Sequence, residues 1–171
     1  MNKNTIIKII VPFVIVAVVA GIWIFKNTQT KTKDVSVKGS DFALETTEID
    51  LDALKAHKLP IIIDFGADSC IPCKEMAPVL KTLNEEMQGK AIIKFVDVWK
   101  YAEAAADFPV QLIPTQVFFD ADGKPYTPSK DLGIELAMYS AKDTGEHVFT
   151  VHQGGLTEEQ MRAILKDMEV E

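Results

Sequence analysis

The pattern of apolar and polar residues divides the chain into an apolar run, a polar stretch and a longer segment of mixed pattern. After a tail at residues 1–5, the run from Ile6 to Phe25 contains Lys8 as its one charged residue. A helix of this length would be about 30 Å long and would match the hydrocarbon core of a bilayer, so the run predicts a transmembrane helix. Residues 26–40 are polar and have no apolar period, which is typical of a tether.

The apolar run has a second interpretation, because Val18, Val19 and Ala20 offer a weak cleavage site for a secretory signal. The run continues through Phe25 and is longer than a usual signal core, which favours a retained signal anchor. Lysines flank the run almost equally on its two sides, so the positive-inside rule does not decide the orientation. The short tail before a first apolar segment is typical of a signal anchor. We therefore expect a single-pass protein of the cell membrane whose body, residues 41–171, is extracytoplasmic.

From residue 41 onward, the pattern is that of an α/β domain. β-branched and aromatic runs predict strands at residues 61–65, 91–98, 115–119 and 147–153, with a shorter one at 42–44. Apolar residues at three- and four-residue steps predict helices at residues 49–59, 70–87, 101–108 and from 157 onward. The order strand, helix, strand implies parallel pairing with a right-handed crossover. Residues 147–153 alternate as a hairpin partner of residues 115–119 would.

Three further patterns in this body predict local structure. Residues 124–146 are longer than a hairpin loop needs and contain several apolar residues, so we expect an ordered insertion. Thr157 and Gln160 form a capping box for the last helix. Four methionines at helix-core spacing predict packing and not chemistry: Met76, Met87, Met161 and Met168.

The distribution of charge excludes one class of function. The formal net charge is -7, and all 25 acidic residues lie at or after Asp34. Binding to a nucleic acid backbone needs clustered Lys and Arg, whereas this acidic body has Arg162 as its one arginine. The sequence therefore does not predict nucleic acid binding.

Both cysteines lie where the strand at 61–65 turns into the helix at 70–87, in the sequence Cys70-Ile71-Pro72-Cys73. Free N–H groups and the positive dipole at a helix start stabilise a thiolate, so Cys70 is expected to be the nucleophile. Cys73 lies one turn later and can resolve a mixed disulfide by closing a bond to Cys70. Pro72 supports the motif by stiffening the turn. The spacing and its place between strand and helix predict a redox-active dithiol.

Asp64 interrupts an apolar strand shortly before the cysteines, where a buried carboxylate is costly. Because Ile63 and Phe65 flank it, we expect a central strand and a buried carboxyl group with a raised pKa. Such a group can pass protons to and from Cys73, which makes Asp64 the third predicted catalytic residue. Lys94 interrupts the next strand in the same way. It either pairs with Asp64 or extends to solvent from an edge strand.

Ile113, Pro114 and Thr115 open the third predicted strand. A proline there removes a donor from the ladder of hydrogen bonds. A cis peptide bond before Pro114 would explain its position.

Together these features resemble the thioredoxin family, from about Phe42 to the C-terminus. The matching positions are the strand at 61–65, Cys70 to Cys73 with Lys74 behind them, Pro78, Ile113-Pro114-Thr115 and Gly154. The resemblance implies an α/β thioredoxin-like fold, with a central mixed β-sheet flanked by helices and here preceded by one N-terminal transmembrane helix.

The same resemblance implies roles for individual residues. Pro114 would be cis and face Cys70, and the segment from Ile113 to Thr115 would dock the substrate chain. Asp64 corresponds to the buried acid of the family and Lys94 to its partner lysine. The redox-active disulfide Cys70–Cys73 would need no further cofactor and no metal.

The activity implied is that of a thiol-disulfide oxidoreductase. Similar anchored proteins commonly reduce apocytochromes during cytochrome c biogenesis, or other exported thiols, and receive electrons from a multi-spanning membrane reductase. The expected partners are therefore protein thiols and disulfides, such an electron donor, and the membrane.

Two departures from the family pattern leave the direction of electron flow open. Ser69 replaces the usual aromatic residue, and Ile71 with Pro72 replaces Gly-Pro. A reductant of protein disulfides is the first hypothesis, and a disulfide-forming oxidase is the alternative. A metal-handling module would use Cys70, Cys73 and a histidine, from His57, His147 and His152. A purely structural module would hold an inert disulfide.

Overall fold

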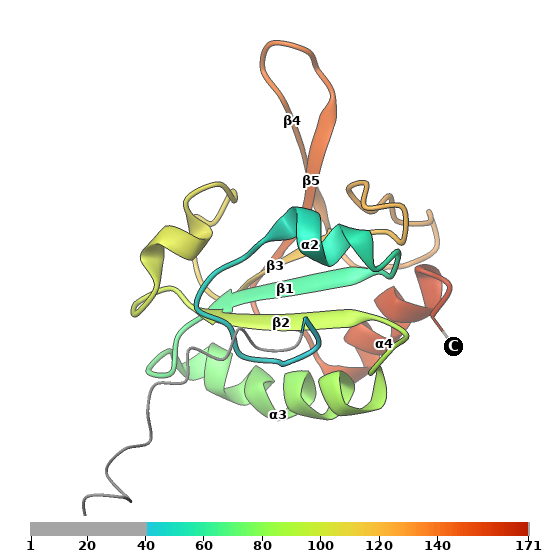
Figure 1. The fold of residues 1–171 in the computed structure, drawn as a ribbon. Coiled ribbons are helices and arrows are strands. Elements are labelled where there is room, and N and C mark those ends of the chain that lie inside the picture. Colours follow the sequence, from blue (N-terminus) through green and yellow to red (C-terminus); the bar gives the residue numbers. More distant parts are fainter. Residues whose placement is uncertain (1–40, 171) are drawn as a thin grey trace, which may run out of the picture. The chain divides into compact units, whose positions relative to one another are not determined.

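The computed structural model describes residues 41–170 (Figure 1). The predicted tail, transmembrane helix and tether lie outside the described residues. Among the residues from 41 to 170, no helix combines the length and hydropathy needed to cross a bilayer.

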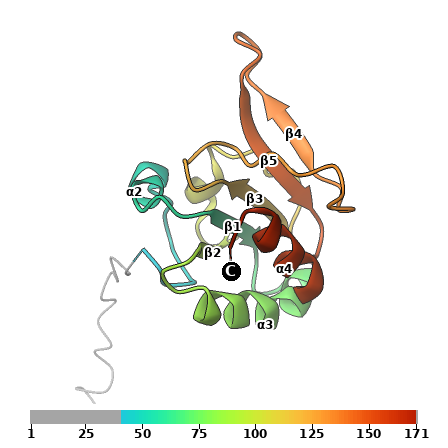
Figure 2. The same ribbon diagram turned by 90° about the vertical axis from the view of Figure 1, so that its right-hand side faces the viewer.

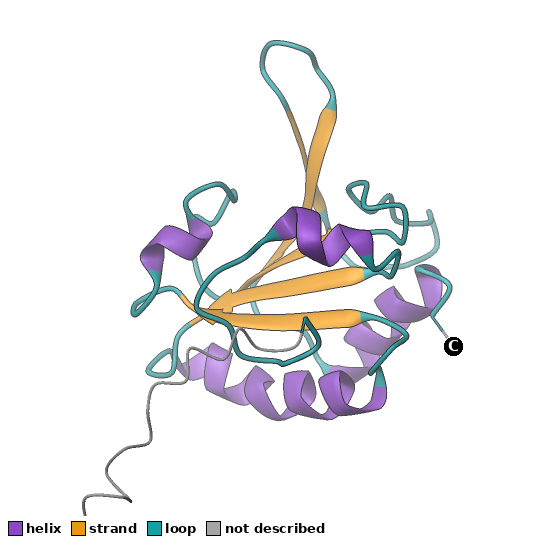
Figure 3. Cartoon of the chain, in the orientation of Figure 1, coloured by secondary structure: helices purple, strands orange, loops and turns teal. Residues whose placement is uncertain are grey.

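Strands and helices alternate along the first half of this domain (Figure 3). In chain order the elements are α2 (Leu51–Ala56), β1 (Ile61–Gly66), α3 (Ile71–Glu86), β2 (Ile92–Asp97), the 3-10 helix η1 (Ala102–Ala105), β3 (Thr115–Phe119), β4 (Ala137–Ser140), β5 (His147–Gln153) and α4 (Glu158–Asp167).

The strands form one mixed five-stranded sheet with the order β2-β1-β3-β5-β4. β1 pairs in parallel with β2, and the other neighbouring strands are antiparallel. The predicted parallel pair and the predicted pairing of residues 115–119 with 147–153 are both confirmed. All six residues of β1 are buried, because this strand is central and covered on both faces.

Alternation along the strands divides the core between the two faces of the sheet. Ile62 and Phe118 point to the face covered by α3 and α4, where the buried methionines also pack. Ile61, Ile63 and Phe65 point to the other face, which α2 and η1 cover. Figure 2 shows α3 and α4 together on one side of the sheet and α2 on the other. Successive residues of a strand therefore reach different layers, and this decides which polar side chains can meet.

Two of the predicted helices are shorter than expected. Asp50 caps α2, with its Oδ1 accepting from the backbone N–H of Ala53 at 3.0 Å, and the positive φ of Lys58 ends the turn that follows. Within the predicted helix at 101–108, Ala102–Ala105 form a 3-10 helix of one turn, since so short a segment before Pro109 does not sustain an α-helix.

The predicted strand at residues 42–44 is wrong, because only an isolated bridge between Glu45 and Phe95 forms there. Side chains occupy the carbonyl groups that a strand would need: Asn84 and Gln88 donate to Phe42, and Lys94 donates to Ala43. The segment is thus held by these side chains and by the backbone bonds of one bridge, in which the Phe95 N–H donates to the Leu44 carbonyl and the Thr46 N–H donates to the Phe95 carbonyl.

Residues 124–146 are ordered, as predicted, and they contain a strand that the pattern did not reveal. β4 pairs with β5 and extends the sheet as a hairpin that projects from the body (Figure 1). Tyr126 anchors the start of the insertion. Its hydroxyl donates to Asp167, and its carbonyl accepts from Thr150.

The start of α4 confirms the predicted capping box. The backbone N–H of Gln160 donates to Thr157 Oγ1 at 3.2 Å, and the backbone N–H of Thr157 donates to Gln160 Oε1 at 2.9 Å. Two otherwise unpaired N–H groups are satisfied in this way.

Candidate functional site

The two cysteines form a disulfide at the start of α3, with their Cα atoms 5.3 Å apart. Cys70 is the N-cap residue of this helix, and its Sγ accepts a hydrogen bond from the Cys73 amide at 3.3 Å. Cys70 is 9% exposed and Cys73 is 4% exposed. Cys70 is therefore the sulfur that a large partner reaches first, although Ile113 covers part of the pair.

Ile113 lies against Cys70, and the predicted cis peptide bond follows it. The Ile113–Pro114 peptide bond is cis, and the Ile113 carbonyl oxygen lies 3.9 Å from Cys70 Sγ. Thr115 is buried, and its hydroxyl donates to the Leu112 carbonyl at 2.7 Å. Ile113 is therefore a neighbour of any chain bound at Cys70.

Asp64 is fully buried in β1, as predicted, behind the disulfide. Its Oδ1 accepts a hydrogen bond from Gln116 Nε2 at 2.6 Å, while its Oδ2 has no partner among the described residues. Burial raises the pKa of Asp64 from the usual 3.8 to about 7, although the bond from Gln116 acts in the opposite direction. The carboxyl group can therefore gain or lose a proton near neutral pH.

Gly66 leaves the space through which Asp64 and Cys73 face each other. A Cβ atom at Gly66 would lie 3.3 Å from Asp64 Oδ2 and 3.3 Å from Cys73 Sγ. Both atoms therefore border the same space beside Gly66, which is free of a side chain because this residue is glycine. A path for a proton between them would run through this space.

Replacing Gly66 by alanine is expected to close this path and to strain the core. The new Cβ would also lie 2.9 Å from Phe95 Cε2, so the free energy of unfolding should fall by about 1–3 kcal/mol. Closure of the Cys70–Cys73 disulfide should also become slower. Guanidinium unfolding and stopped-flow oxidation of the reduced chain would measure both effects.

Gly155→Ala is the matched control for this substitution. The Cβ atom that it adds would lie 4.0 Å from the carbonyl oxygen of Pro72, an ordinary van der Waals contact. If Gly66→Ala and Gly155→Ala closed the disulfide at the same rate, Gly66 would not be part of a proton path.

The predicted pairing of Lys94 with Asp64 is wrong. Lys94 lies opposite Ile63 in the register of β1 and β2, so it points to the other face of the sheet from Asp64. Its Nζ donates to the Ala43 carbonyl at 2.7 Å, and the residue is 4% exposed, so it does not extend to solvent either. Burial lowers the pKa of Lys94, and the charge of Asp41 opposes this effect.

Gln116 is the functional candidate that the sequence analysis missed. It lies directly opposite Asp64 in the antiparallel pair of β1 and β3 and is fully buried. A signal was present in the sequence, because Gln116 interrupts an apolar strand just as Asp64 does.

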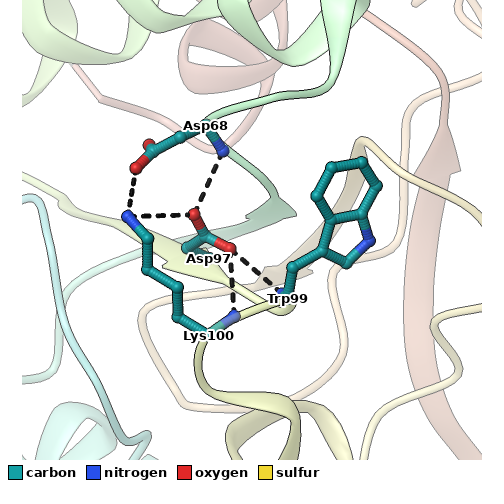
Figure 4. A network of polar contacts seen from close by, with 4 residues as sticks. All are labelled: Asp68, Asp97, Trp99 and Lys100. Carbon is teal, nitrogen blue, oxygen red and sulfur yellow. Dashed lines mark hydrogen bonds and ion pairs between the residues drawn. The ribbon is translucent and has the colours of Figure 1, made fainter.

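A second missed residue, Asp97, ties the loop before Cys70 to the loop after β2 (Figure 4). Its carboxylate accepts from the amides of Asp68, Trp99 and Lys100 at 3.1, 3.0 and 3.2 Å. The ammonium group of Lys100 bridges Asp97 and Asp68. Burial alone would raise the pKa of Asp97, but these hydrogen bonds outweigh it and hold the pKa below its usual value. The network fixes the turn that presents Cys70.

Large apolar side chains are exposed on the loops next to the disulfide. Ile71 is 72% exposed between the cysteines, and Trp99 is 65% exposed beside the Asp97 network. Leu112, just before the segment that lies against Cys70, is also exposed.

The three histidines are held by other contacts. His57 bonds to Asp41, His147 to Thr150, and His152 to the Glu135 carbonyl. Within residues 41–170, no group of three His, Cys, Asp or Glu side chains is placed to hold a metal ion. The described part of the chain gives the metal-handling alternative no support.

Comparison with known proteins agrees with this geometry. A thioredoxin family model matches residues 42–133. Thioredoxin 1 of Chlorobaculum tepidum is 44% identical over 68 residues, which are 40% of this chain and 67% of that protein. Thioredoxin of Staphylococcus aureus is 39% identical over 82 residues, which are 48% of this chain and 77% of that protein.

A solved structure of chloroplastic thioredoxin z shares the fold. The match covers 74% of this chain and 94% of the thioredoxin z chain, with a TM-score of 0.52 and a sequence identity of 20%. At this identity the likeness concerns the fold alone.

Proposed function

Since this chain belongs to the thioredoxin family and is a thiol-disulfide oxidoreductase with a Cys70–Cys73 pair, we propose that it reduces protein disulfides from an anchored, extracytoplasmic position. The observation that carries the proposal is the carboxyl group of Asp64, which lies beside Cys73 next to Gly66. A base beside Cys73 accelerates closure of the enzyme disulfide, the step that completes reduction of a substrate, while the reduction potential of the pair sets the direction of electron flow.

The reaction begins with the reduced pair. The Cys70 thiolate, stabilised by the start of α3, attacks one sulfur of a substrate disulfide. The substrate disulfide breaks, a mixed disulfide forms, and the other substrate sulfur leaves as a thiolate that takes a proton from solvent. The segment from Ile113 to Thr115 lies against Cys70 and docks the substrate chain during this step.

The second step closes the enzyme disulfide. Asp64 takes the proton from the Cys73 thiol, and the resulting thiolate attacks Cys70 Sγ. The mixed disulfide breaks, and the substrate leaves with its second sulfur as a thiolate. Two electrons have then passed from the enzyme dithiol to the substrate. The pair serves as its own redox cofactor, and a membrane reductase that supplies a dithiol would regenerate it.

The reduction potential of the Cys70–Cys73 pair tests the direction. The full-length chain, kept in solution with a mild detergent, would be equilibrated with glutathione buffers and its thiols counted after alkylation. We expect a potential of about -250 mV or lower, in the range of reducing thioredoxins. A potential above about -180 mV would identify the chain as a disulfide-forming oxidase instead.

The anchor and the location need a separate test. Ile6 to Phe25 supports the anchor by its length and hydropathy. Right-side-out membrane vesicles carrying the reduced chain would be treated with a membrane-impermeant maleimide. Labelling of the cysteines before lysis is expected, and labelling only after lysis would overturn the location.

A further inference from the structure

Gln116 holds one oxygen of the buried carboxyl group in a fixed place. Its Nε2 donates to Asp64 Oδ1 at 2.6 Å and also lies 3.4 Å from Met76 Sδ. Both N–H groups of the amide thus have an acceptor, one from β1 and one from α3. A flipped amide would bring Oε1 against the ionised carboxylate, with two acceptors in contact, so the ionised form of Asp64 selects the orientation seen here.

The other oxygen of Asp64 remains available for chemistry. Oδ2 is buried and has no hydrogen-bond partner among the described residues, and it lies on the side of Gly66 where Cys73 Sγ also lies. A buried oxygen without a donor is costly, and Asp64 Oδ2 shares this condition with Gln116 Oε1. Oδ2 lies beside Cys73 Sγ, which indicates a use for it. We infer that Gln116 is a positioning residue, which occupies Oδ1 so that Oδ2 is the oxygen that takes the proton of Cys73.

Among the described residues, Gln116 is the one whose side chain donates a hydrogen bond to the Asp64 carboxyl group. On the face of the sheet that Asp64 occupies, β2 presents Ile93 and Phe95, because Lys94 points to the opposite face. α3 presents Met76 and Cys73, and β3 presents Gln116. Cys73 is therefore the titratable group that Asp64 faces, and Gln116 is the polar side chain that donates to it.

Gln116 also stabilises the ionised form of Asp64 against burial, since a donated hydrogen bond favours the charge. Asp64 must be ionised to accept the proton of Cys73 in the closing step. Without the donor, a larger share of the protein would hold a neutral Asp64 at pH 7, and that share could not deprotonate Cys73. This inference rests on the proposed function, because it concerns the step in which the enzyme disulfide closes.

Gln116→Met tests the inference, since methionine has a similar length and shape but no donor. The full-length chain in detergent would be mixed with a disulfide substrate, and the rate of the closing step would be followed from pH 5 to pH 9. The midpoint of the rate profile is expected to rise by about one pH unit or more, because a hydrogen bond to a charged group is lost. At pH 7 the rate should fall about fivefold or more, and it should recover at high pH.

The matched control is Val117→Ala. Val117 lies next to Gln116 in β3 but packs on the other face of the sheet, so its truncation weakens the core without touching Asp64. A midpoint shift of the same size in Val117→Ala, or an unchanged midpoint in Gln116→Met, would overturn the inference. Should Gln116→Met fail to fold, Gln116→Leu also removes the donor, with a smaller apolar side chain, and is expected to raise the midpoint in the same direction.

A second measurement separates this inference from the proposed function. The carboxyl carbon of Asp64 can be titrated by NMR in the disulfide form, where no substrate and no electron flow are involved. Gln116→Met should shift this titration upward and Val117→Ala should not. If the titration shifts but the chain does not reduce disulfides, the proposed function fails and the link between Gln116 and Asp64 stands. If it does not shift, the inference fails whatever the activity.

Discussion

Cys70→Ser is expected to abolish disulfide reduction by the full-length chain, with a loss of about a thousandfold or more. The serine hydroxyl is not ionised at neutral pH, so the start of α3 has no anion to stabilise and no nucleophile to present. Turbidity of insulin under a chemical reductant would measure the activity. Activity equal to that of the unmodified chain would refute the assignment of Cys70 as the nucleophile.

Cys73→Ser is the informative partner of this substitution, because it should stop the reaction half-way. Cys70 can still attack, but no thiol is left to close the enzyme disulfide, so the mixed disulfide with the substrate should accumulate. Non-reducing electrophoresis would detect it as a covalent adduct. If Cys70→Ser formed the adduct and Cys73→Ser did not, Cys73 would be the nucleophile and Cys70 the resolving cysteine.

Asp64→Asn is expected to make the domain more stable at pH 8 by roughly 4 kcal/mol, with little change at pH 4. In the folded chain, burial raises the pKa of Asp64 to about 7, whereas the unfolded chain has the usual 3.8. Between these values the folded state binds the proton more tightly, so its stability falls as the pH rises from about 4 to about 7. Asparagine keeps the shape and still accepts from Gln116, but it carries no charge at any pH.

Denaturant unfolding of the oxidised chain at several pH values would measure this difference. Oxidised protein is used so that the Cys73 thiol does not titrate. Asp122→Asn is the control, because Asp122 lies exposed in the turn after β3 and its removal should have little effect at either pH. A gain in stability that did not depend on pH would mean that the charge of Asp64 is not the cause.

Local sequence was sufficient for most of the elements around the site. The run at Ile61, the cysteine spacing and the capping box at Thr157 each depend on neighbours within a few residues, and each is found where it was predicted. The burial of Asp64 was also predictable, since a polar residue inside an apolar run must be covered if the strand is central.

Contacts between strands were not predictable in the same way. Lys94 and Gln116 both interrupt apolar strands, and the sequence does not say which of them meets Asp64. A shift of one residue in register reverses the face to which a side chain points, so the register of β2 separates Lys94 from Asp64 and that of β3 brings Gln116 to it. The strand β4 was missed because its four residues, Ala137–Ser140, show no alternation of apolar and polar side chains. These residues form a strand because they pair with β5.

The sequence by itself determined the family resemblance, the dithiol at a helix start and the buried acid behind it, because these follow from residue type and short-range spacing. Only the tertiary structure decided the partner of that acid, the opening that Gly66 leaves toward Cys73 and the Asp97 network under the cysteine turn. These contacts join residues far apart in the chain, and their geometry is set by strand register and by packing between layers.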